Sequence, residues 1–234
     1  GGTTTLQGGG SGLKLTDGVA YGERYFRKYA EPGCLARNVE TENEVNPANS
    51  WVDLPGDLPK WNKLVAESKK GPIIVHLAEG KPSRRMAREF AYAQNSGLMG
   101  ANFVAVHGVG LKREHFDAMA KVKAKLVWSP LSNFLLYGMT ADVDAAQEAG
   151  VQISLAPDWA PSGSKSVLGE LKVADRVNRH ALGKVFGDGD LVRMVTRNPA
   201  AALGWHEALG QISPGFLADL IIVDDRSADA YWIR

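Results

Sequence analysis

Cysteine, long apolar runs and clustered basic residues are all scarce in this chain of 234 residues. The single cysteine, Cys34, excludes an intramolecular disulfide and is typical of a protein kept in the reducing cytoplasm. No apolar run approaches the roughly 18 residues that a membrane-spanning helix needs, and no secretory signal opens the sequence. We therefore expect a cytoplasmic protein that does not enter a membrane.

Neither positive nor negative residues are in clear excess. The formal net charge is +1, and Lys and Arg never occur in runs longer than two. A nucleic-acid surface would need a basic cluster, so this class of partner is not expected. With 44% hydrophobic residues, the chain can form a buried core, and it is predicted to fold into one large domain, alone or with a small appendage.

Three apolar segments each lead to a side chain that can bind a metal ion or transfer a proton. Such runs, bounded by glycine or proline, predict strands buried on both faces of a parallel sheet. The carboxyl ends of parallel strands share one edge, where α/β enzymes carry their chemistry. Segment 72–77 contains His76 and is followed by Glu79. Segment 102–107 ends in His107, and segment 151–156 is followed by Asp158.

Strands and helices alternate regularly from residue 72 onward, which predicts βαβ units and an α/β fold. In this part we expect helices at 83–95, 113–121, 141–149 and 167–182, a further strand at 125–128, and a loop at 131–138 after the Ser129-Pro130 break. Before it we expect short strands at 1–8 and 34–39, helices at 21–29 and 61–69, and a loop at 41–59. After it we expect helices at 190–196 and 198–203 and an apolar strand within 211–224.

His76, His107 and Asp158 offer the nitrogen and oxygen donors that zinc and similar divalent ions prefer. Glu79 would lie beside such an ion without having to bind it, where a carboxylate can move a proton between an activated water and a leaving group. Either histidine alone is equally well explained as a hydrogen-bonded group that caps a strand. Three strand ends together with Glu79 favour the metal site.

The order of these motifs resembles the amidohydrolase superfamily, in particular the branch of cytosine and guanine deaminases, adenosylhomocysteine deaminase and atrazine chlorohydrolase. A Thr-Arg-Asn-Pro segment and a Pro-Gly-x-x-Ala-Asp-Leu-Ile-Ile-Val segment near the end are similar to that family's return into a small β-sandwich domain. The matching pieces are His76–Glu79, His107-Gly108, Ser129–Leu136, Pro157-Asp158, residues 196–204 and residues 210–223.

This resemblance implies a distorted (β/α)₈ TIM-like barrel with one catalytic divalent metal ion, zinc or alternatively iron. His76 and Asp158 would be its ligands, and Asp158 would also accept the proton of the metal-bound water. Glu79 would carry that proton to the departing nitrogen. His107 would polarise the reacting centre, or bind the metal directly in a variant site.

The family's first strand carries a His-x-His pair that completes the metal site, and this sequence contains no His-x-His. A complete barrel takes about 250 residues, so we expect a partial chain that lacks the first barrel strand. Residues 1–208 are then expected to form the barrel from about its second to its eighth strand. Residues 209–234 are expected to begin the small β-sandwich domain.

Residues expected to contact substrate are His107, Asn133 and Trp159. Asn133 lies in a Pro/Ser/Asn segment after a strand, although asparagine is also simply common in turns. Trp159, like Trp128 and Tyr137, falls in a loop at the catalytic end and could stack on a flat heterocycle. Packing explains such aromatic residues equally well.

The function expected from these residues is metal-dependent hydrolysis of a non-peptide carbon–nitrogen bond, with deamination of a nitrogen heterocycle as the first candidate. Hydrolysis of an amide or a halide is the alternative within enzymes. A non-catalytic scaffold that keeps the barrel is the alternative outside them. The expected partner is a small-molecule substrate, and assembly into a homo-oligomer is left open.

Overall fold

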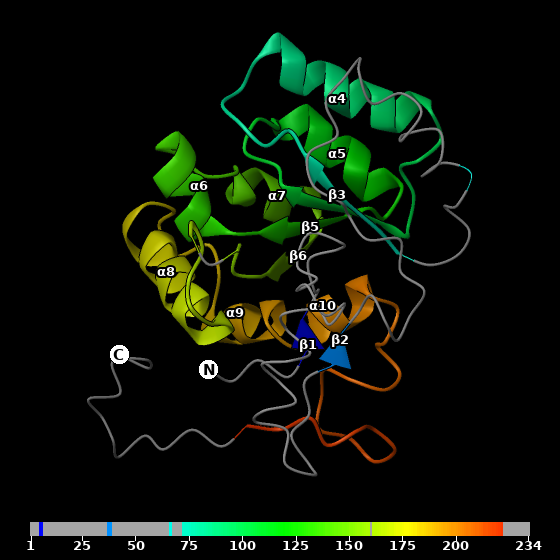
Figure 1. The fold of residues 1–234 in the computed structure, drawn as a ribbon, viewed down its shortest axis with the longest axis vertical. Coiled ribbons are helices and arrows are strands. Elements are labelled where there is room, and N and C mark those ends of the chain that lie inside the picture. Colours follow the sequence, from blue (N-terminus) through cyan, green and yellow to red (C-terminus); the bar gives the residue numbers. More distant parts are fainter. Residues whose placement is uncertain (1–4, 7–36, 39–65, 67–71, 160, 222–234) are drawn as a thin grey trace, which may run out of the picture.

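The computed structural model describes residues 5–6, 37–38, 66, 72–159 and 161–221. Its centre is a parallel sheet of four strands in the order β3-β4-β5-β6, each paired with the next along the chain (Figure 1). The strands are β3 (Ile73–Leu77), β4 (Phe103–His107), β5 (Lys125–Trp128) and β6 (Gln152–Leu155). The strands and the α/β class expected from the sequence are therefore confirmed.

Helices connect these strands and follow the last of them. They are α4 (Arg84–Asn95), α5 (Arg113–Lys121), α6 (Pro130–Tyr137), α7 (Val143–Ala149), α8 (Val167–His180), α9 (Asp188–Met194) and α10 (Arg197–Ala202). Side chains cap several of them at the N-terminus: Ser83, Asp142 and Ser166 each accept a hydrogen bond from a backbone N–H of the first turn. Six of the seven helices lie where the sequence predicts a helix.

Before the central sheet, β1 (Thr5–Leu6) and β2 (Arg37–Asn38) form a short parallel pair. They fall within the strands expected at 1–8 and 34–39. The helix expected at 21–29 and the loop expected at 41–59 lie outside the described residues, as does the helix expected at 61–69 except for Ala66, which is helical.

Alternate residues of each strand pack on opposite faces of the sheet, as the two-residue period of a strand requires. Ile73, Val75 and Leu77 belong to a large core cluster that also contains apolar side chains of α4, α5, α7, α8 and α9. Ile74 belongs to a smaller cluster with Val104 and Ala202, the last residue of α10. Both faces of the sheet are thus covered, which explains why its strands are mostly apolar.

The loop expected at 131–138 is wrong, because these residues belong mostly to helix α6. Pro130 is the first residue of this helix. Proline is favoured there because an N–H at this position would have no intrahelical partner, so that its absence costs no hydrogen bond. The backbone N–H of Leu131 donates to the buried carboxylate of Glu170 on α8 at 2.9 Å, and Gly138, at φ 68°, ends the helix. Pro130 therefore starts a helix and is not the break that the sequence indicates.

The end of the described chain also differs from expectation. Residues 211–221 contain turns and irregular backbone and form no strand within the described part, so the apolar strand predicted there is not found up to residue 221. The proposed start of a second domain at residue 209 stays a prediction. None of the described helices is both long and apolar enough to cross a membrane.

Candidate functional site

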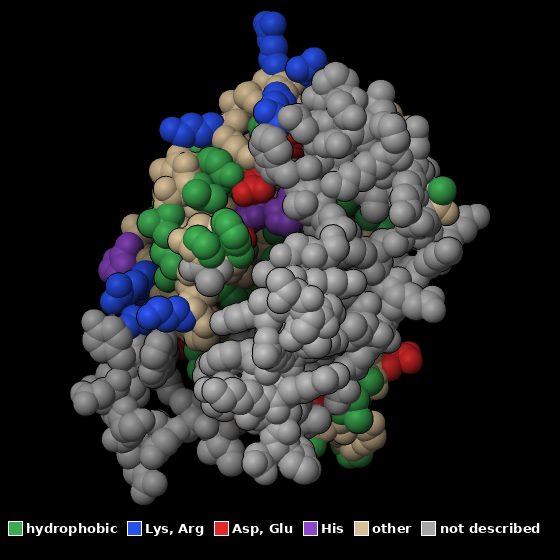
Figure 2. Space-filling model, viewed as in Figure 1, with side chains coloured by type: hydrophobic (Ala, Val, Ile, Leu, Met, Phe, Trp, Pro, Cys, Tyr) green, Lys and Arg blue, Asp and Glu red, His purple; other side chains and the backbone are tan. Residues whose placement is uncertain are grey.

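The carboxyl ends of β3 and β4 lie next to each other, since Leu77 pairs with His107 in the parallel ladder. His76, Glu79 and His107 each place one ligand atom within 4.8 Å of those of the other two. The rings of His76 and His107 are 5.1 Å apart between centroids. Figure 2 shows histidine and acidic side chains next to each other near the centre of this face, beside a group of hydrophobic side chains.

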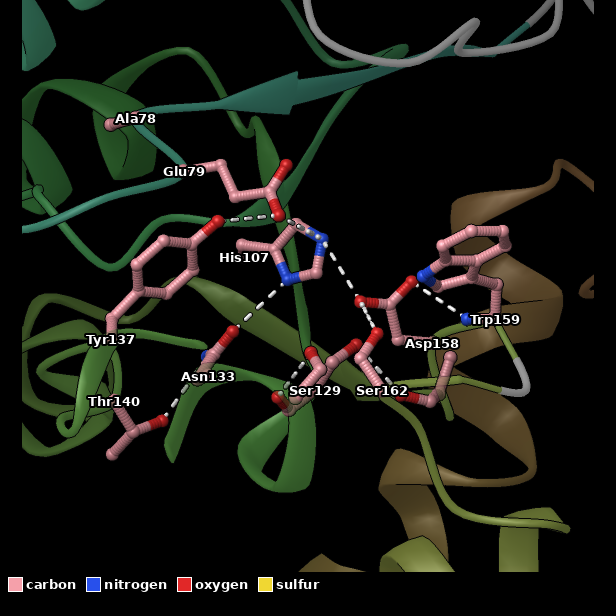
Figure 3. A network of polar contacts seen from close by, with 12 residues as sticks. Ala78, Glu79, His107, Ser129, Asn133, Tyr137, Thr140, Asp158, Trp159 and Ser162 are labelled. Atoms are coloured by element: carbon pink, nitrogen blue, oxygen red, sulfur yellow. Dashed lines mark hydrogen bonds and ion pairs between the residues drawn. The ribbon is translucent and has the colours of Figure 1, made fainter. Parts of the chain in front are cut away.

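Asp158, which follows β6, reaches the same place. His107 Nε2 is 3.9 Å from Asp158 Oδ2 and 3.6 Å from Glu79 Oε1 (Figure 3). The two carboxylates are mostly buried, with 13% of the Glu79 side chain and 16% of the Asp158 side chain exposed. The structure therefore brings together all four side chains that the sequence places at strand ends.

A left-handed turn directs Glu79 into the site. Ala78, the residue after β3, has a backbone φ of 50°, which residues other than glycine rarely adopt. Its N–H donates to the buried carboxylate of Glu89 at 3.1 Å, and its carbonyl accepts from Gly80 and Gly110 at 3.0 and 2.9 Å. These hydrogen bonds hold the strained residue, and the chain turns so that Glu79 faces His107 in Figure 3.

The far side of the His107 ring is held by a buried polar network. His107 Nδ1 is 3.0 Å from Asn133 Oδ1, while Asn133 Nδ2 donates to Thr140 Oγ1 at 3.2 Å. The same hydroxyl accepts from Trp128 Nε1 at 2.7 Å. With its amide oxygen facing the ring, Asn133 accepts from Nδ1–H, which leaves Nε2 as the ring nitrogen that faces the carboxylates.

Two imidazole nitrogens of this site have no partner among the residues that the structure describes. His76 Nδ1 and His107 Nε2 are buried, and no hydrogen bond reaches either of them. Buried polar atoms are normally paired, and lone pairs that face carboxylates repel them unless a cation or proton lies between. A set of imidazole nitrogens and carboxylate oxygens suits zinc or iron, so these residues fit a divalent ion.

The protonation state of His76 agrees with this fit. Burial, followed by the neighbouring His107, lowers the pKa of His76, and these effects outweigh the nearby carboxylates Glu79 and Asp158, which raise it. His76 is therefore neutral near pH 7, which is the form that binds a metal ion.

A tight loop holds Asp158. Its Oδ1 accepts from the backbone N–H of Trp159 at 2.7 Å, and its Oδ2 accepts from the Ser162 hydroxyl at 3.4 Å. Gly163 packs directly on its backbone: a Cβ at Gly163 would lie 2.6 Å from both the N and the carbonyl C of Asp158. Only glycine fits there without displacing Asp158.

On the catalytic role predicted for Asp158, Gly163→Ala is expected to lower turnover by about 10²-fold, the effect of a displacement of roughly 1 Å in a catalytic group. The matched control is Gly189→Ala, because a Cβ at this helical position of α9 meets nothing closer than 3.5 Å. Steady-state kinetics and melting temperature of both variants measure the effect. Undiminished turnover in Gly163→Ala would contradict the importance of this packing.

Tyr137, at the end of α6, contributes to the site in a way that the sequence analysis missed. Its hydroxyl donates to Glu79 Oε1 at 2.9 Å. Burial and this hydrogen bond raise the pKa of Tyr137, so that it stays protonated and acts as a donor. Recognising 130–137 as a helix would have placed Tyr137 one turn from Asn133, and both beside the strand ends.

The residues expected to contact substrate occupy different surroundings. Asn133 is fully buried beneath His107, whereas Trp159 is 70% exposed next to Asp158. Their roles, and those of His76, Glu79, His107 and Asp158, stay predictions. For Trp128, packing is the alternative that holds: the side chain is fully buried in the main core cluster and cannot stack on a ligand.

Solved structures of known proteins confirm the barrel fold. Guanine deaminase of E. coli superposes with a TM-score of 0.62 at 20% identity, over 84% of this chain and 46% of the deaminase. The atrazine chlorohydrolase of Arthrobacter aurescens TC1, solved with zinc, superposes with a TM-score of 0.62 at 18% identity, over 84% of this chain and 44% of that enzyme.

Proteins that are similar in sequence also include deaminases. A 5-methylthioadenosine/S-adenosylhomocysteine deaminase of Syntrophobacter fumaroxidans is 28% identical over 221 residues, which are 91% of this chain and 49% of the relative. A protein of the same name from Pyrococcus furiosus is 27% identical over 71% of this chain and 42% of its own length. The chain thus spans about half the length of these relatives. The amidohydrolase family profile matches residues 52–231, so that the chain belongs to the amidohydrolase family.

Proposed function

We propose that the protein is a metal-dependent hydrolase of non-peptide carbon–nitrogen bonds that deaminates a nitrogen heterocycle. One observation carries this proposal: His107 Nε2, buried and without a hydrogen-bond partner among the described residues, lies 3.6 Å from Glu79 Oε1 and 3.9 Å from Asp158 Oδ2, and His76 belongs to the same cluster of ligand atoms. The names of the curated relatives, which are deaminases of adenine nucleosides, support the same reaction and make that substrate class the first to test.

His76 and Asp158 would hold the ion, with His107 beside it or as a further ligand. We propose zinc, with iron as the alternative, because the donor set suits both and a similar solved chlorohydrolase contains zinc. A divalent ion held there supplies the Lewis acid that makes water nucleophilic near neutral pH.

The side chains of the chain itself would do the proton chemistry. Asp158 accepts the proton of the attacking water at a carboxylate oxygen. Glu79 delivers a proton to the departing nitrogen as the carbon–nitrogen bond breaks and its electron pair stays on nitrogen. His107, fixed by Asn133, presents Nε2 to the reacting centre and can hydrogen-bond or polarise it.

Three further proposals concern the whole protein. We propose that residues 1–208 belong to the barrel and that 209–234 begin a second domain, on the order of motifs alone. We propose a cytoplasmic location because the chain has a single cysteine. The substrate is a small molecule, and a homo-oligomer is compatible with this assignment.

Ammonia release tests the reaction. The zinc-loaded protein is incubated with 5-methylthioadenosine, S-adenosylhomocysteine, guanine, cytosine and atrazine, and ammonia and chloride are measured separately. We expect ammonia from at least one amino-substituted ring, loss of turnover after treatment with a chelator, and recovery when zinc is added back. Chloride release alone would favour a chlorohydrolase, and a protein that binds no metal and releases neither product would favour a scaffold.

A further inference from the structure

We propose that Tyr137 is a positioning residue that holds Glu79 in the orientation from which it protonates the leaving group. This inference rests on the proposed function. The Tyr137 hydroxyl donates to Glu79 Oε1 at 2.9 Å, and the same oxygen is 3.6 Å from His107 Nε2 (Figure 3). One donor therefore fixes the carboxylate oxygen that lies nearest the centre of the site.

The helix that carries Tyr137 is itself held at its start and in its middle. At its start, the N–H of Leu131 donates to Glu170, whose carboxylate is fully buried on α8. One turn before Tyr137, Asn133 is fully buried and contacts His107. Since residues four apart lie on the same face of a helix, α6 presents Asn133 to the histidine and Tyr137 to the glutamate as one rigid unit.

Glu79 needs such a partner, because its side chain has three rotatable bonds and follows the strained turn at Ala78. Among the described residues, only Tyr137 donates a hydrogen bond to the Glu79 carboxylate. Hydrogen bonds from a hydroxyl to a carboxylate are among the stronger ones in proteins. Removing the hydroxyl would leave the carboxylate free to rotate away from the substrate, which lowers the fraction of encounters in which proton transfer is possible.

The leaving group distinguishes positioning of the acid from a general structural effect. An amine leaves only when nitrogen takes up a proton as the carbon–nitrogen bond breaks. Chloride leaves with the bonding electron pair and needs no proton. A defect confined to proton delivery by Glu79 therefore slows an amino-substituted substrate much more than its chloro-substituted counterpart, whereas a distorted site slows both.

Tyr137→Phe is the test, measured in the zinc-loaded protein. The substrates are the amino-substituted heterocycle that the wild-type protein turns over fastest and the same ring with chlorine in place of the amino group. We expect kcat for the amino substrate to fall by about tenfold or more, part of the 10²–10⁴-fold that general acid catalysis contributes. We expect KM, zinc content and kcat for the chloro substrate to change little.

Tyr92→Phe on α4 is the matched control and should leave the ratio of the two kcat values unchanged. An equal fall for both substrates, or no fall for either, in Tyr137→Phe would overturn the inference while leaving the proposed function intact. A wild-type protein that releases no ammonia would overturn the proposed function and this inference with it. If Tyr137→Phe melts below the assay temperature, Tyr137→Leu removes the same donor and gives the same comparison.

Discussion

Glu79→Gln is expected to lower kcat by about 10²–10⁴-fold, the range that a positioned general acid or base contributes. Glutamine has the size of glutamate and can still accept the hydrogen bond from Tyr137 through its amide oxygen, but it cannot take up and release a proton. The surroundings of the side chain should therefore be preserved while proton transfer to the leaving nitrogen is lost. Ammonia release under saturating substrate measures kcat directly.

Two controls separate this effect from damage to the site. Bound zinc and melting temperature should match those of the wild-type protein, because Glu79 is not proposed as a necessary ligand. Glu114→Gln, at an exposed position in the first turn of α5, should leave kcat unchanged. If Glu79→Gln loses its zinc, Glu79 is a ligand, which its place within 4.8 Å of both histidine donors would allow; full activity would exclude it from catalysis.

The sheet and the location of the site could be predicted because both depend on local sequence patterns. Apolar runs ended by glycine or proline give the strands, and the residue that follows each run marks the carboxyl edge. His76, His107 and Asp158 are each found in this way from a few neighbouring residues. Parallel pairing then brings them together without any knowledge of distant contacts.

Helix α6 could not be predicted by the same means, because what stabilises it is distant in sequence. The residue that accepts the hydrogen bond at its start, Glu170, is 39 positions from Leu131. The contact of Tyr137 with Glu79 spans 58 positions. The Ser-Pro pair at the start of this segment is compatible with both a turn and a helix start. Local sequence therefore does not distinguish a loop from a helix at 131–138, and only the distant contacts do.

The role of Trp128 was missed for a related reason. An aromatic residue at the end of a strand near a predicted site suggests stacking, but its indole N–H donates to Thr140 and its ring packs with Phe186 in the core. Thr140 in turn holds Asn133, which holds His107. Trp128 thus supports the site from beneath, a function that becomes visible only when the hydrogen-bond partners are known.

The left-handed residues at the strand ends were also beyond prediction. Ala78 and His107 have φ of 50° and 69°, in the region where glycine or asparagine would be expected. The buried carboxylate of Glu89, 11 positions away, helps to hold Ala78 in this conformation. Strain that the rest of the fold maintains is typical of functional sites, which agrees with the proposed roles of Glu79 and His107.

Asp158→Ala is expected to abolish both metal binding and turnover, with kcat reduced by at least about 10³-fold, since it removes a ligand and the base that takes the proton of water. Asp158→Asn separates the two roles: its amide oxygen can remain a ligand, but it cannot accept the proton. We therefore expect Asp158→Asn to keep part of its zinc and still lack turnover. Zinc content measured by mass spectrometry, together with ammonia release, gives both quantities.

Asp188→Asn, at an exposed position in the first turn of α9, is the matched control and should retain zinc and activity. Gly163 packs on the Asp158 backbone, and the N–H groups of Ser162 and Gly163 donate to the Trp159 carbonyl; both features remain in the two Asp158 variants, so neither variant needs to unfold the loop. Melting temperatures check this point. An Asp158→Ala protein that is free of metal and still active would refute the proposed reaction, because no other arrangement of the described residues supplies both the ligand and the base.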